Sequence, residues 1–159
     1  MCIRDSSNYV LPTTAALQAT ISRRALTAEL TGSPTKTYDG NSVATLNAAD
    51  FRLTGFVSGQ GASVTQTQGA YASADAGQRA VTVNLGAGDF AAQGDTRLSN
   101  YILPTSATGV GRINPAVLTA SIIGNPTKVY DGAATATLTA ADYQLTGFVA
   151  GQGASVTQA

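Results

Sequence analysis

One stretch of the chain occurs twice. Residues 32–66 have the sequence GSPTKTYDGNSVATLNAADFRLTGFVSGQGASVTQ, and residues 124–158 have the sequence GNPTKVYDGAATATLTAADYQLTGFVAGQGASVTQ. Tyr130 follows Tyr38 by 92 positions, Tyr101 follows Tyr9 by the same number, and most aligned positions are identical. A period of this length fits a whole domain and exceeds the roughly 20 to 45 residues of a solenoid unit. The repeat therefore predicts domains in tandem.

The repeat also predicts where the domains begin and end. Residues 1–6, MCIRDS, have no counterpart in the other copy and resemble a translated sequencing-library adapter. We expect residues 7–20 to be the tail of a preceding repeat, 21–112 to be a complete repeat domain, and 113–159 to be a truncated next repeat. The chain would then be a fragment. We expect the half-repeat to be frayed and to expose sheet edges, because it lacks closing strands.

Apolar and polar side chains alternate in several short segments, which is the pattern of half-buried strands. The clearest cases are residues 25–32, ALTAELTG, and 79–85, RAVTVNL. Further strands are predicted at residues 35–38, 42–46, 51–55, 62–66, 100–104 and 107–113, with one helical turn near 48–50 and a turn-rich excursion at 69–78. About seven short strands predict an all-β chain of tandem, small antiparallel sandwiches of Ig-like size. A β-grasp fold is the alternative.

Composition excludes several classes of function. Nine basic and nine acidic residues cancel, so no clustered charge favours nucleic acid as a partner. No apolar run approaches the roughly 20 residues that span a bilayer, so membrane insertion is not expected. The chain has no histidine, and its single cysteine is Cys2. We find no nucleophile paired with a base, so we expect no enzyme activity, no catalytic residue and no cofactor.

The tripeptide Tyr38-Asp39-Gly40, repeated as Tyr130-Asp131-Gly132, is the most prominent candidate site. Asp-Gly is a strong turn signal, because Gly tolerates positive φ and Asp bonds nearby backbone amides. In this interpretation the tyrosine packs as a cover on the sheet. The functional alternative is a ligand contact at the tip of the domain.

Five aspartates are candidate ligands for a metal ion. Asp39, Asp50, Asp75, Asp89 and Asp95 could in principle hold calcium, but none has the spacing of a calcium loop, so we predict turn aspartates and no metal.

Lys36 and Lys128 are the only lysines, and each copy has one. Lys36 could form an amide crosslink with Asn84 or Asn100, or it could guard an edge strand. We predict that Tyr101 is a core residue, that Asn100 bonds a nearby loop, and that Tyr71 is a loop aromatic.

Several motifs in combination resemble one known family. They are Lys-x-Tyr-Asp-Gly, Leu-Thr-Gly-Phe-Val-x-Gly-Gln-Gly-Ala-Ser-Val, Asn-Tyr-x-Leu-Pro and Ile-x-x-x-x-Leu-Thr-Ala. Together they resemble the YDG repeat domain of filamentous-haemagglutinin-type bacterial surface adhesins. The resemblance implies an extracellular, adhesin-like protein at a Gram-negative cell surface, secreted through a partner pore. Many family members have Gly-Asp after the Gly-Phe-Val segment, whereas this chain has Gly59-Gln60 and Gly151-Gln152.

The join between the copies bears on function. Residues 110–119, VGRINPAVLT, form no Gly/Ser-rich or Pro-rich linker, so the last strand of one domain is expected to lead directly into the next. We therefore expect a structural stalk or spacer whose partners are the neighbouring repeats. The alternative is an adhesive module in which each repeat binds a host glycan or protein. An exposed shelf of two or more aromatic rings would favour the alternative.

Overall fold

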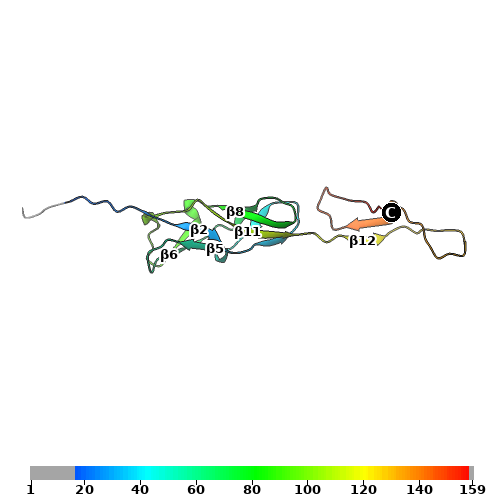
Figure 1. The fold of residues 1–159 in the computed structure, drawn as a ribbon, viewed down its shortest axis with the longest axis horizontal. Coiled ribbons are helices and arrows are strands. Elements are labelled where there is room, and N and C mark those ends of the chain that lie inside the picture. The colour runs from blue at the N-terminus through cyan, green and yellow to red at the C-terminus, as the bar shows by residue number, and fades with distance from the viewer. Residues whose placement is uncertain (1–16, 158–159) are drawn as a thin grey trace, which may run out of the picture.

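The computed structural model describes residues 17–157. The adapter-like segment 1–6 and most of the predicted tail at 7–20 lie outside the described residues. The chain forms one packed body of strands, and the second copy of the repeat continues from it along the same axis (Figure 1). The repeat copies therefore lie end to end.

The packed body contains a five-stranded sheet. Its order is β3 (Thr35–Thr37), β11 (Ser106–Asn114), β8 (Gly77–Asn84), β7 (Gln68–Tyr71) and β4 (Val43–Thr45). The strands β8 and β11 form its long antiparallel centre, with Ser106 opposite Asn84 and Ile113 opposite Gly77. The short strand β3 joins β11 in parallel, with Lys36 opposite Ile113. Strand β11 is thus paired on both sides near its end.

Three two-stranded ladders complete the body. They are β2 (Thr27–Leu30) with β5 (Phe51–Thr54), β6 (Gly61–Val64) with β9 (Phe90–Gln93), and β1 (Arg24–Ala25) with β10 (Tyr101–Ile102). The first two ladders and the sheet share one core, so burial of apolar surface holds the layers together. Its buried members are Leu30, Ala44, Leu46, Val64, Tyr71, Val81, Val83, Leu85, Phe90, Ala107 and Ile113.

The all-β prediction is confirmed. Residues 17–157 contain no α-helix, only the 3₁₀ turns η1 (Ala48–Asp50), η2 (Ala87–Asp89), η3 (Leu98–Asn100) and η4 (Ala140–Asp142). The helical turn expected near 48–50 is η1, which is too short to cover a sheet as the helix of a β-grasp fold does. In this part of the chain no helix is long and apolar enough to cross a membrane.

Some details differ from the prediction. The packed body has eleven strands instead of about seven. The predicted turn-rich excursion at 69–78 is only partly a turn. It begins with strand β7 and ends with the start of strand β8. Strand β9 was missed, because Phe90 alone among its four side chains is buried and no alternation signals it. Two ladders, β1–β10 and β3–β11, are parallel, so the body is not purely antiparallel.

The second copy repeats local structure without forming a core. Strands β12 (Thr119–Ile122) and β13 (Tyr143–Thr146) pair in the same register as β2 and β5. The hydroxyls of Thr119 and Thr146 lie 2.6 Å apart, as do those of Thr27 and Thr54. No residue in 114–157 is buried. A tandem array of two packed sandwiches is therefore not shown, and fraying of this half remains a prediction.

Ile113 and its repeat counterpart Ile21 offer a matched test of this core. Ile113 is fully buried, whereas Ile21 is 97% exposed. We expect Ile113→Ala to lower the free energy of unfolding by about 2–5 kcal/mol, because it leaves a cavity. Ile21→Ala should change it by less than about 0.5 kcal/mol. Urea unfolding of both variants measures this, and equal effects would contradict the assigned core.

Candidate functional site at the inter-repeat junction

The Tyr38-Asp39-Gly40 segment forms the predicted turn. It follows β3, and the amide of Tyr38 donates to the carbonyl of Asn114 over 2.8 Å. Gly40 has φ +81°, in the left-handed region that favours glycine. The amide of Asn41 donates to Oδ1 of Asp39 over 3.1 Å. The ring of Tyr38 is half-buried against the core, so the turn covers the sheet as predicted.

Lys36 is tied to this turn. Its Nζ lies 2.6 Å from Oδ1 of Asp39 and donates to Oδ1 of Asn41 over 2.7 Å. The hydrogen bond from Lys36, with that from the Asn41 amide, lowers the pKa of Asp39 from its ordinary value. Asn84 instead lies opposite Ser106 in the β8–β11 ladder, and Asn100 ends η3 with its amide bonded to the Arg97 carbonyl. The structure therefore brings neither predicted asparagine to Lys36, and brings Asn41 instead.

The Lys36–Asn41 contact makes the crosslink hypothesis testable. A Lys–Asn amide forms with loss of ammonia and needs a neutral lysine and a proton-donating carboxyl group. The hydrogen bond from Lys36 lowers the pKa of Asp39, so this carboxyl group is held in its charged form and does not donate a proton. We expect intact mass spectrometry to give the mass of the uncrosslinked chain. The control is Asn41→Ala, which copies Ala133 of the second repeat; a loss of ammonia in the parent but not in this variant would contradict the expectation.

Three of the remaining aspartates, Asp50, Asp75 and Asp89, form hydrogen bonds within their own turns. Oδ2 of Asp50 accepts from the amide of Asn47 over 2.8 Å, and Oδ2 of Asp89 accepts from the amide of Gly86 over 2.7 Å. The hydroxyl of Ser73 donates to Asp75 over 2.5 Å, and Asp95 is exposed in the turn after β9. Within residues 17–157, no three His, Cys, Asp or Glu side chains gather as a metal site.

The prediction for Tyr71 is wrong. It ends β7 and is 4% exposed, and its hydroxyl donates to the carbonyl of Pro34 over 2.8 Å. Burial raises the pKa of its phenol. Tyr71 was misplaced because β7 was not recognised inside the predicted excursion.

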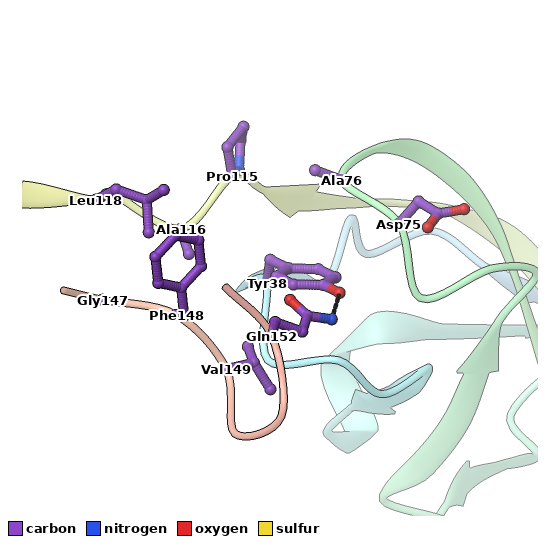
Figure 2. A pocket seen from close by; sticks show the side chains of 10 residues that line it. All are labelled: Tyr38, Asp75, Ala76, Pro115, Ala116, Leu118, Gly147, Phe148, Val149 and Gln152. Carbon is purple, nitrogen blue, oxygen red and sulfur yellow. Dashed lines mark hydrogen bonds between the residues drawn. The ribbon is translucent and has the colours of Figure 1, made fainter. Parts of the chain in front are cut away.

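A candidate site lies where the two copies meet. Nε2 of Gln152 donates to the hydroxyl of Tyr38 over 2.6 Å, joining residues of different repeats (Figure 2). A cavity of about 350 Å³ adjoins this contact. It is lined by Tyr38, Asp75, Ala76, Pro115, Ala116, Leu118, Gly147, Phe148, Val149 and Gln152. A Cβ at Gly40 would lie 3.2 Å from Cγ1 of Val149, so the turn packs closely against this loop.

The loop that meets Tyr38 has a locally determined shape. In residues 147–152, Gly151 has φ +82° and the amide of Gln152 donates to the Val149 carbonyl over 3.0 Å. The equivalent loop 55–60 has φ +81° at Gly59 and the same 3.0 Å bond from Gln60 to Val57. Both copies therefore hold the glutamine in the same backbone turn.

In the complete repeat, loop 55–60 is anchored on Tyr101. The hydroxyl of Tyr101 donates to Oε1 of Gln60 over 2.5 Å and accepts from the amide of Val57 over 3.2 Å. The rings of Phe56 and Tyr101 meet edge to face, with centroids 5.2 Å apart. Tyr101 is buried, as predicted for a core residue.

Sequence reasoning identified both motifs of this junction but not their contact. Tyr38 and Gln152 are 114 positions apart and belong to different copies. Gln60 and Gln152 were noted only as replacements for an expected Asp. No signal in the sequence placed the Tyr-Asp-Gly turn beside the join, because its position there follows from the parallel pairing of β3 with the end of β11.

Comparison with known proteins agrees with these motifs. Residues 22–109 match the YDG domain. Because this match covers more than half of the chain, the chain belongs to the YDG domain family. Neither a curated protein nor a solved structure matches the chain significantly.

A double-mutant cycle measures the junction contact. We expect Tyr38→Phe to lower the free energy of unfolding by about 0.5–1.5 kcal/mol, the usual net value of one hydrogen bond. Gln152→Ala should cost little more in the Tyr38→Phe background, because both substitutions remove the same bond. Tyr130→Phe is the matched control, since Tyr130 is 92% exposed, and it should have no effect. Additive effects of Tyr38→Phe and Gln152→Ala would contradict the contact.

Proposed function

We propose that this chain is part of the stalk of a large secreted bacterial surface adhesin of the filamentous-haemagglutinin type. Each repeat acts as a non-catalytic spacer, and its immediate partners are the neighbouring repeats. The array lies outside the cell and projects another part of the protein from the surface. Family membership and the motif resemblance support this placement.

One observation carries the proposal. Strand β11 pairs with β3 as far as Asn114, and β12 begins at Thr119, so only residues 115–118 separate the last strand of the packed body from the first strand beyond it. A connection of this length gives little slack. The Tyr38–Gln152 bond adds a second contact between the copies beside it. Both features favour repeats held in line.

Surface chemistry favours a spacer over an adhesive module. In residues 17–157, Tyr130 is the only fully exposed aromatic ring, and Tyr71 is buried. A glycan-binding shelf would need two or more exposed rings.

The stalk proposal predicts how an array grows. One, two or three extra copies of residues 21–112, inserted after Thr20, should lengthen the particle by the same increment per copy in small-angle X-ray scattering. The control arrays carry a flexible Gly-Ser spacer at each join. Their particle size should rise roughly with the square root of the number of copies, as in a freely jointed chain. Square-root growth in the array without spacers would contradict a stalk.

Binding is tested separately with the whole chain on arrays of glycans and host extracellular proteins. We expect no reproducible hits. Saturable binding that survives competition with an unrelated β protein would contradict the spacer proposal and support the adhesive module.

A further inference from the structure

The complete repeat has a second cavity at the end opposite the junction. It measures about 370 Å³, and Arg23, Arg24, Val57, Gln60 and Tyr101 are among its lining residues. We call this surface the N-terminal face. Under the offset of 92, Arg24, Val57 and Gln60 correspond to Ala116, Val149 and Gln152, which line the junction cavity. The N-terminal face is therefore the same surface that the second copy presents to Tyr38.

We propose that the N-terminal face is the docking site for the Tyr-Asp-Gly turn of another copy of this domain, placed before it in the array. This inference rests on the proposed function and names the partner surface that it requires. The junction at the other end of the domain identifies this partner. There the Tyr-Asp-Gly turn meets loop 147–152, which is equivalent to loop 55–60 of the N-terminal face.

The hydrogen-bonding groups of the glutamine fit this role. Oε1 of Gln60 accepts from Tyr101 of its own repeat, and the contacts among residues 17–157 leave its Nε2 free. Gln152 uses Nε2 to bond Tyr38 of the repeat before it. A side-chain amide has both an acceptor and donors. One glutamine can therefore join two tyrosines, its own through oxygen and that of the preceding repeat through nitrogen.

Charge adds a preference for this partner. At the junction, Asp75 lines the cavity together with Pro115 and Ala116. The corresponding positions of the N-terminal face are Arg23 and Arg24. A preceding copy docked in the same way would bring its Asp75 to these two arginines. Exposed ion pairs are weak and screened by salt, so the arginines favour an acidic partner more than they strengthen the join.

The test uses the full chain with one extra copy of residues 21–112 inserted after Thr20, so that a complete repeat precedes the N-terminal face. Tyr38→Phe is made in the leading copy and Gln60→Ala in the following copy, singly and together. We expect non-additive effects in urea unfolding, with a coupling of roughly two- to twelvefold in the unfolding equilibrium constant. The matched control places both substitutions in the following copy, where Tyr38 and Gln60 lie at opposite ends of one domain, and should be additive.

Salt tests the arginines in the same chain. Arg23→Pro and Arg24→Ala in the following copy give these two positions the residues of the natural join, Pro115 and Ala116. We expect added salt to lower the stability of the parent array more than that of this variant, while the Tyr38–Gln60 coupling remains in both. Additive effects in the first experiment would overturn the docking site, even if scattering still showed a rod. Saturable binding of an anionic glycan that Arg24→Ala abolishes would also overturn it, by assigning the face a different occupant.

Discussion

Strand β11 is the element on which the rest of the structure depends. Its buried side chains, Ala107 and Ile113, belong to the core, and its two edges pair with β8 and β3. The same strand then leads directly into the next repeat. Because the residues that complete one domain also set the direction of the next, the packing of the first repeat orients the chain that leaves it. A rod needs no separate hinge or linker in such an arrangement.

The Tyr-Asp-Gly turn combines an internal and an external role. Within its repeat the turn connects β3 to β4. Its shape is held by short polar contacts among Lys36, Asp39 and Asn41. Its tyrosine hydroxyl remains available at the end of the domain and meets Gln152 of the next copy. The turn interpretation and the tip-contact interpretation are therefore compatible, with the neighbouring repeat as the ligand.

Local signals predicted the fold class and several elements well. Alternation found β2 and β8, the Asp-Gly pair found the turn, and residues 48–50 form the expected helical turn. These features depend on side chains close in sequence. Strand β9, strand β7 and the start of β8 were missed, because they are stabilised by partners distant in the sequence. The parallel pairing of β3 with β11 was also missed, since it joins strands from opposite ends of the domain.

The sequence by itself determined the repeat, its period and the shape of each short motif. This is clear from the second copy, in which β12, β13 and the loop at 147–152 keep their local geometry although no residue in 114–157 is buried. Only the tertiary structure decided which motifs meet. Contact between Tyr38 and Gln152 requires the whole first repeat to pack, because its core fixes where β3 ends relative to β11. Backbone conformation follows from neighbouring residues, whereas contact between copies follows from the length and packing of a complete domain.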